Sequence, residues 1–155
     1  MIQLRHIGLY VENLDKETEF YKSVFHMYPI CEKIKQADTL LIDLLKHVNA
    51  SILVTKLITD QGKKNGMDDM LELIQVTAPT QCMVKNISKM NIYTPRCLHL
   101  GFGIDNIEET IDKILLRNGK QYTAIHLMEN GNKCCFCKDP EENWLELIES
   151  CNNKT

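Results

Sequence analysis

The stretch HIGLYVENLD, from His6 to Asp15, aligns without a gap onto HLGFGIDNIE, from His99 to Glu108. Farther along the chain, the tetrapeptide LELI also occurs twice, as residues 71–74 and as residues 145–148. Each half therefore opens with a histidine, an apolar residue and a glycine, and closes with LELI. Because self-similarity within a short chain usually reveals its architecture, the sequence predicts a duplicated module.

A strand is expected at the start of each half, where apolar residues alternate with other residue types. The apolar positions share one face of such a strand, and each histidine lies on the opposite face. These positions are Ile7, Leu9 and Val11 in the first half and Leu100, Phe102 and Ile104 in the second. The apolar face is expected to pack against a helix.

Both strands are predicted to lead into a helix, because Asn and Asp residues that can cap a helix follow them. The cap candidates are Asn13 and Asp15 in the first half and Asp105 and Asn106 in the second. Apolar residues then recur with helical spacing, namely Phe20 and Val24, and Ile107, Ile111, Ile114 and Leu115. The sequence RNG indicates that the second helix ends with Gly119 in the left-handed conformation.

The closing LELI segments have the two-residue period of a strand. In each of them the two leucines share one face and the glutamate, Glu72 or Glu146, lies on the other. If the leucines face the helices, both glutamates point to the side on which His6 and His99 lie. A βαβββ unit used twice could thus direct four liganding side chains into one concavity.

The first half is longer than the second by about 19 residues between these markers. An amphipathic stripe with Asp38 as its cap predicts an inserted helix from Asp38 to Val48. The segment QGKKNGMDD is expected to be a hairpin loop, with Gly62 and Gly66 in turn conformations. The polar stretch that follows, residues 77–97, is expected to connect the two modules.

The composition of the chain limits which partners and which cellular compartment are expected. The chain has 155 residues, 44% of them hydrophobic and 25% charged, with a formal net charge of −3, which is typical of an ordinary globular protein. The absence of a basic stripe argues against nucleic acid and anionic membrane as partners. No apolar run approaches the roughly 20 residues of a membrane span, and the first residues do not resemble a signal peptide. We expect a cytoplasmic protein.

Seven cysteines in such a chain are expected to be reduced, mostly buried thiols rather than a disulfide framework. Cys134 and Cys137 form a C-x-x-C motif, but the surrounding sequence NKCCFCKD is typical of a strand. Residues three apart on a strand point to opposite faces. The motif is therefore not expected to bind a metal ion.

With these motifs the chain resembles the vicinal oxygen chelate superfamily, which includes glyoxalase I, methylmalonyl-CoA epimerase, extradiol dioxygenases and fosfomycin and bleomycin resistance proteins. The motifs are RHIGLYVENLDKETEFYKSVF, MLELI, CLHLGFGIDNIEETI and KDPEENWLELIE. The last is close to the family's Asp-Pro-x-Gly-Asn-x-x-Glu-Leu ending, except that Glu142 stands where glycine is usual. The resemblance implies an α+β fold in which two βαβββ modules form a curved eight-stranded mixed sheet. Residues 1–155 would make a single glyoxalase-like domain, with module one at 1–76, a linker at 77–97 and module two at 98–150.

The resemblance implies that His6, Glu72, His99 and Glu146 are the metal ligands. Two imidazoles and two carboxylates suit one divalent ion such as Zn, Ni, Mn, Co or Fe, and they leave two octahedral positions for neighbouring oxygens of a small-molecule substrate. The alternative is an exposed strand face that carries the same residues without a metal.

This ligand set is most similar to that of glyoxalase I, which implies a lyase or isomerase in which Glu146 or Glu72 is the catalytic base, and a homodimer. A non-catalytic ligand-binding or antibiotic-resistance protein of the same fold is the alternative function. A fosfomycin-type transferase or hydrolase, which uses three protein ligands, is a third. Tyr10, Trp144, Ile148 and Leu4 are candidates for the pocket wall, and Lys56 and Arg5 for contact with an acidic substrate.

Overall fold

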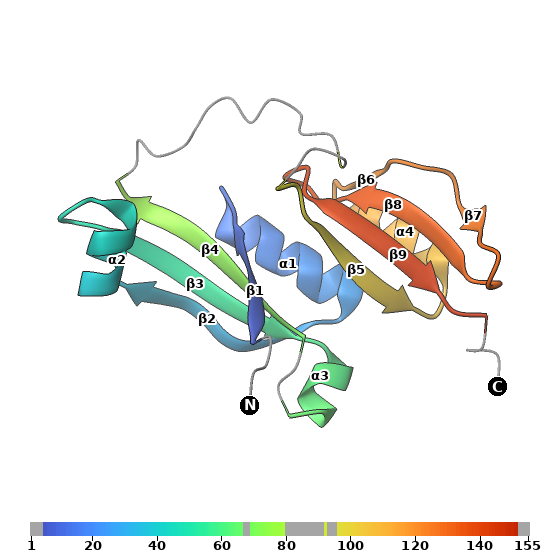
Figure 1. Ribbon diagram of the computed structural model, residues 1–155, viewed down its shortest axis with the longest axis horizontal. Coiled ribbons are helices and arrows are strands. Elements are labelled where there is room, and N and C mark those ends of the chain that lie inside the picture. Colours follow the sequence, from blue (N-terminus) through green and yellow to red (C-terminus); the bar gives the residue numbers. More distant parts are fainter. Residues whose placement is uncertain (1–4, 67–68, 80–91, 93–95, 152–155) are drawn as a thin grey trace. The chain divides into compact units, whose positions relative to one another are not determined.

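The computed structural model describes residues 5–66, 69–79, 92 and 96–151 (Figure 1). The chain divides into two compact units, Met1–Asn86 and Ile87–Thr155, and each unit is built on its own sheet. Most of the predicted linker and the pocket-wall candidate Leu4 lie outside the described residues. No helix in the described ranges is both long and apolar enough to cross a membrane.

The first unit has a four-stranded sheet in the order β1-β4-β3-β2. Its elements are β1 (His6–Tyr10), α1 (Leu14–Phe25), β2 (Tyr28–Gln36), α2 (Thr39–Leu45), β3 (Ser51–Ile58), α3 (Asp60–Lys64) and β4 (Met70–Ala78). The first and last strands pair in parallel, whereas β2, β3 and β4 pair antiparallel. The first module is thus the predicted βαβββ unit with two short helices added.

The second unit repeats this arrangement with the order β5-β9-β8-β6 and β7 also paired with β8. Its elements are β5 (His99–Ile104), α4 (Ile107–Leu116), β6 (Lys120–Gln121), β7 (His126–Leu127), β8 (Lys133–Lys138) and β9 (Trp144–Glu149). Again the first and last strands are parallel. The α+β class is confirmed. Among the described residues the two sheets have four and five strands, and the fifth strand arises because two short strands, β6 and β7, stand where one was expected.

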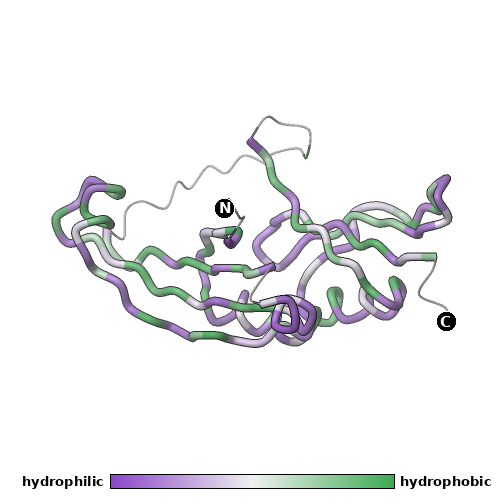
Figure 2. The backbone as a smooth tube through the Cα atoms, turned by 60° about the horizontal axis from the view of Figure 1, so that its bottom comes forward, coloured by the Kyte–Doolittle hydropathy of each residue, from purple (hydrophilic) through white to green (hydrophobic). Residues whose placement is uncertain are grey.

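The leucines of both LELI segments form the buried side of each sheet. Leu73, Leu145 and Leu147 are completely buried and Leu71 is nearly so. Hydrophobic and hydrophilic stretches alternate along the tube in Figure 2, as expected for elements with one buried and one exposed side. The predicted helix positions are buried as well, namely Phe20, Val24, Ile107, Ile111 and Ile114. Two expectations fail, since Leu115 is half exposed and Ile7 lies on the edge strand β1 with 40% of its surface accessible.

The helix that follows the first strand of each unit is held at its N-terminus by two groups. Asn13 and Asn106 are the N-caps, as predicted, and accept hydrogen bonds from the backbone N–H groups of Lys16 and Glu109. The second group comes from the last strand. Gln75 Oε1 accepts from Leu14 N at 3.0 Å, and Glu149 Oε2 accepts from Ile107 N at 2.8 Å.

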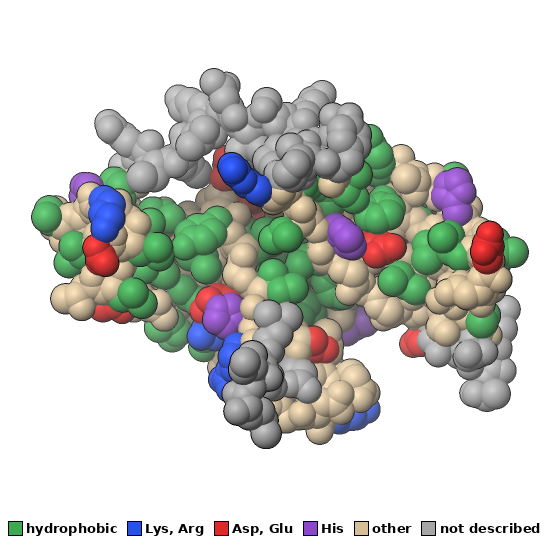
Figure 3. All heavy atoms as spheres, in the orientation of Figure 1, with side chains coloured by type: hydrophobic (Ala, Val, Ile, Leu, Met, Phe, Trp, Pro, Cys, Tyr) green, Lys and Arg blue, Asp and Glu red, His purple; other side chains and the backbone are tan. Residues whose placement is uncertain are grey.

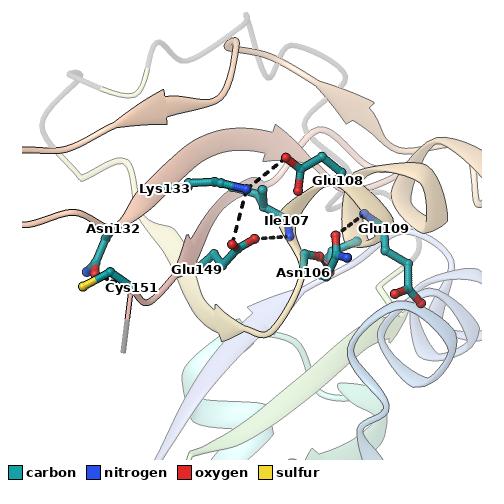
Figure 4. A network of polar contacts seen from close by, with 9 residues as sticks. Asn106, Ile107, Glu108, Glu109, Asn132, Lys133, Glu149 and Cys151 are labelled. Atoms are coloured by element: carbon teal, nitrogen blue, oxygen red, sulfur yellow. Dashed lines mark hydrogen bonds and ion pairs between the residues drawn. The ribbon is translucent and has the colours of Figure 1, made fainter. Parts of the chain in front are cut away.

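Glu149 belongs to a wider network that Figure 4 shows around the start of α4. Lys133 Nζ lies 3.3 Å from Glu149 Oε1 and 3.0 Å from Glu108 Oε1. The hydrogen bond to Glu108, followed by that to Glu149, raises the pKa of Lys133. The lysine stays positively charged, so it stabilises the carboxylate that anchors the helix.

The inserted helix is present as α2, with Asp38 as its N-cap as predicted, but it ends at Leu45 and not at Val48. Of its predicted apolar stripe, Leu40, Leu44 and Val48 are exposed. Leu41 of this helix packs with Ile52, Val54 and Ile74, which share the side of the sheet on which Glu72 lies. The prediction for residues 61–69 was only partly right. A one-turn helix, α3, forms there because Thr59 Oγ1 caps Gly62 N at 3.0 Å, and a positive φ is found only at Gly66 among the two predicted glycines.

Gly119 has a different role from the predicted one. The left-handed residue after α4 is Asn118, with a φ of 64°. At Gly119 the backbone instead passes so close to its neighbours that an added Cβ would lie 2.6 Å from Ile114 Cγ2 and 2.7 Å from the carbonyl oxygen of Lys138. Glycine is required here by close packing of the helix end against β8.

We expect Gly119→Ala to lower the free energy of unfolding by about 1–3 kcal/mol, because the added methyl group overpacks this contact. Gly103→Ala is the matched control, since a Cβ there would meet no atom within 4 Å. Urea unfolding monitored by circular dichroism would measure both. Equal effects of the two substitutions would show that the close approach at Gly119 is not a constraint.

Candidate metal-binding site

The first unit brings two of the predicted ligands together. His6 Nε2 lies 3.3 Å from Glu72 Oε2. The parallel pairing of β1 with β4 causes this contact, because it sets Gly8 beside Glu72 and His6 beside Met70. With no side chain at Gly8, the imidazole of His6 reaches the carboxylate along the same face of the sheet.

The second unit contains the equivalent pair. His99 Nε2 lies 3.2 Å from Glu146 Oε2. The parallel register of β5 and β9 matches that of the first unit, with Gly101 beside Glu146 and His99 beside Trp144. Figure 3 shows histidine side chains against acidic side chains at the molecular surface.

Each pair has the chemistry and the spacing of two ligands of one ion. Two donor atoms bound at about 2.1 Å to a first-row ion, at a right angle, are about 3 Å apart. The two nitrogen–oxygen distances of 3.3 and 3.2 Å are close to this value. Within the described part of each unit, no three His, Cys, Asp or Glu side chains are placed to share an ion. Each unit thus contains one His–Glu pair, called a half-site below because it is half of the predicted four-residue set, and that set stays a prediction.

The family model of the Glyoxalase/Bleomycin resistance protein/Dioxygenase superfamily matches residues 3–147. The chain belongs to this superfamily. The match spans both half-sites, as the duplicated motifs predicted.

Solved structures of this superfamily have the same fold as the chain. A glyoxalase family protein from Bacillus cereus is 13% identical, with 96% of this chain and 94% of that one covered at a TM-score of 0.83. A glyoxalase family protein from Enterococcus faecalis is 19% identical, with coverage of 95% and 97% and a TM-score of 0.59. A fosfomycin resistance protein from Listeria monocytogenes is 13% identical, with coverage of 100% and 99% and a TM-score of 0.60. No curated protein sequence matches the chain.

The two half-sites of this superfamily member differ in their third strand. In the first, Lys56 of β3 is paired with Glu72 and its Nζ lies 3.1 Å from Glu72 Oε1. In the second, Phe136 of β8 occupies the matching position beside Glu146. Its ring meets the ring of His99 edge to face, with centroids 5.6 Å apart. Sequence reasoning considered Lys56 only as a substrate contact and missed Phe136, although the alternation of residues along both strands places them on the faces of the glutamates.

Trp144 lies on the same face as Glu146, as predicted, but it is covered by neighbours. Lys138 Nζ lies 4.3 Å from the centre of its ring, and Tyr122 meets it edge to face at 4.6 Å. Trp144 is consequently buried. These contacts pack around the start of β9, two residues before Glu146.

The described cysteines are free thiols, as expected, but they are not mostly buried. Only Cys135 and Cys137 are buried, whereas Cys151 is exposed and the others are partly exposed. Cys134 and Cys137 fall on opposite faces of β8, and the two that meet are Cys135 and Cys137, with Sγ atoms 3.4 Å apart. Burial raises the pKa of Cys135 and of Cys137. Burial and the negative charge of Glu146 raise the pKa of Cys134. All three thiols are therefore protonated and unreactive near neutral pH.

The departure at Glu142 has a structural explanation. Its φ is 71°, a left-handed conformation that costs a residue with a Cβ roughly 1–2 kcal/mol. Its carboxylate pairs with Lys120 and also with Lys138 Nζ, 3.0 Å away. These lysines offset part of the cost.

Hydrogen bonds from Lys120 and then Lys138 lower the pKa of Glu142 below its ordinary value of 4.5. The stabilisation is therefore fully present above pH 4.5 and is lost as the pH falls through the lowered pKa of the folded state. We expect Glu142→Gln to cost up to about 1 kcal/mol at pH 7, since the pair is half exposed, and nothing at the acid end. Unfolding free energies of both proteins across this range would test it. A difference that does not depend on pH would show that the ion pairs contribute nothing.

Proposed function

We propose that this chain is a divalent-metal-dependent lyase or isomerase of the glyoxalase I type, which acts on a small substrate chelated through adjacent oxygens. One observation carries the proposal, namely the recurrence of a His–Glu contact at the same parallel register in both units. A strand surface without a function would not be expected to carry the same contact between an imidazole and a carboxylate in both units. We propose His6, Glu72, His99 and Glu146 as the ligands.

A divalent ion held by these residues would stabilise negative charge on a substrate oxygen by several kcal/mol when a proton leaves the neighbouring carbon. The residues of the chain must then accept that proton and return it. A carboxylate can do so if it is within reach of the carbon and is not neutralised by a cation.

Glu146 meets these requirements better than Glu72. It is the more exposed of the two, with 26% of its side chain accessible against 13% for Glu72. Glu72 is paired with Lys56, whose Nζ lies 3.1 Å from Oε1, so its carboxylate is already engaged by a cation. In the described structure Glu146 has no lysine or arginine partner. We therefore propose Glu146 as the principal base, with Glu72 chiefly a ligand.

The metal requirement can be tested by dialysis against Ni, Zn, Mn, Co or Fe, followed by elemental analysis and by an assay with methylglyoxal and a thiol. We expect about one ion per four-residue set, and binding weakened about tenfold or more in Glu72→Gln and Glu146→Gln. Leu147→Ala is the matched control. It should lose roughly 2–5 kcal/mol of stability through a core cavity while the ligands stay chemically intact. Full metal content in both glutamine variants would refute the site assignment.

An antibiotic-resistance or simple ligand-binding role is the second candidate. It is favoured by the Lys56–Glu72 ion pair, which balances the charge of one half-site without any metal. Titration of the metal-free protein with bleomycin and with fosfomycin separates the two functions. Micromolar binding without metal, together with less than about a tenth of an equivalent of ion after dialysis, would favour this role.

A further inference from the structure

The two half-sites have the same backbone register but differ in charge at one position. Lys56 pairs with Glu72 across β3 and β4, and Phe136 pairs with Glu146 across β8 and β9. A residue that pairs directly with another across two antiparallel strands shares its face and lies within reach of its side chain. One glutamate therefore has an ammonium group as its neighbour, and the other has an aromatic ring.

Both oxygens of Glu72 are engaged. Oε1 lies 3.1 Å from Lys56 Nζ and Oε2 lies 3.3 Å from His6 Nε2. Lys56 is itself two-thirds covered, with 32% of its side chain accessible, so solvent screens the pair less than it would at the open surface. In the second half-site, His99 is the only ion-pair partner of the Glu146 carboxylate among the residues that the structure describes.

A divalent ion at the first half-site would have to share Glu72 with a fixed positive charge about one side chain away. Like charges at such separations repel by an amount that matters for affinity even with partial screening. No such repulsion arises beside Phe136. The two half-sites should therefore differ in their affinity for a divalent ion.

We propose that Lys56 is a positioning residue that holds Glu72 and makes His6 and Glu72 the weaker half of the metal site, so that His99 and Glu146 dominate ion binding. This inference rests on the proposed metal-dependent function. It assigns Lys56 a role through Glu72 and not through contact with the ion.

Ni²⁺ alone serves as the probe, with affinity measured by calorimetry and occupancy by the shift in melting temperature. Lys56→Met should bind Ni²⁺ more tightly, by about tenfold, because Glu72 is released and the repulsion is removed. Lys56→Arg should bind as the wild type does, since its charge and its pairing with a carboxylate are kept. Lys22→Met is the matched control, because Lys22 is similarly exposed at 36% and pairs with Glu32 at 2.9 Å in the same unit.

The reciprocal substitution tests the other half-site. Phe136→Lys places an ammonium group beside Glu146 and should weaken Ni²⁺ binding by about tenfold. Phe136 is only partly buried, so a lysine can reach solvent there. Lys56→Met alone keeps the proposal testable if this variant does not fold.

The outcomes separate this inference from the proposed function. If Glu72→Gln weakens Ni²⁺ binding while Lys56→Met leaves it unchanged, the metal site stands and the role of Lys56 is refuted. If neither the wild type nor Lys56→Met binds Ni²⁺, both proposals fail. If Lys56→Met binds more tightly and Lys56→Arg restores the wild-type affinity, the inference is supported, because a merely structural lysine would not show this pattern.

Discussion

Parallel pairing between the first and last strand of each module is the interaction on which the rest of the structure depends. Parallel neighbours cannot be joined by a tight turn, so a long connection must separate them. Here that connection contains a helix and further strands of the same sheet. The connection runs from β1 to β4 through β2 and β3 in the first unit, and from β5 to β9 through β6, β7 and β8 in the second. The contact between each histidine and its glutamate is therefore a product of the complete module.

The same strand pair also fixes the helix. Three residues beyond each glutamate, Gln75 or Glu149 accepts a hydrogen bond from the first backbone N–H of the helix that follows the opening strand. In a strand, residues three apart point to opposite faces, so the glutamate lies on one face while the anchoring side chain lies on the face of the leucines and the helix. The last strand of each unit thus carries the predicted ligand on one face and anchors, on its other face, the helix that packs against the leucines. This coupling explains why the duplicated motif spans more than the ligands.

Much of this arrangement follows from the sequence because its signals are local. The alternation of leucine and glutamate in LELI, the Asn caps and the cap at Asp38 all act within a few residues, and the structure has them as predicted. The apolar stripe after Asp38 was a weaker guide, since Leu40, Leu44 and Val48 are exposed. The exposure of Ile7 could not be predicted, since it depends on β1 being an edge strand. The role of Gly119 depends on the approach of β8, far along the chain. The contrast between Lys56 and Phe136 required the register of antiparallel strands, which only the tertiary structure defines.

A chain with two copies of one strand faces a problem of partner choice while it folds, because β4 and β9 offer the same tetrapeptide to β1 and β5. The residues directly after LELI differ between the two strands and favour the observed pairing. Gln75 is paired with Leu53, and Glu149 with Lys133. If β9 took the place of β4, the Glu149 carboxylate would face a leucine, and a partly buried charge without a counter-ion is costly. If β4 took the place of β9, Lys133 would face an amide instead of a carboxylate. The first unit thus has a neutral pair, Gln75 and Leu53, where the second has an ionic pair, Glu149 and Lys133. This difference disfavours swapped strands, although Glu72 and Glu146 are the same residue type.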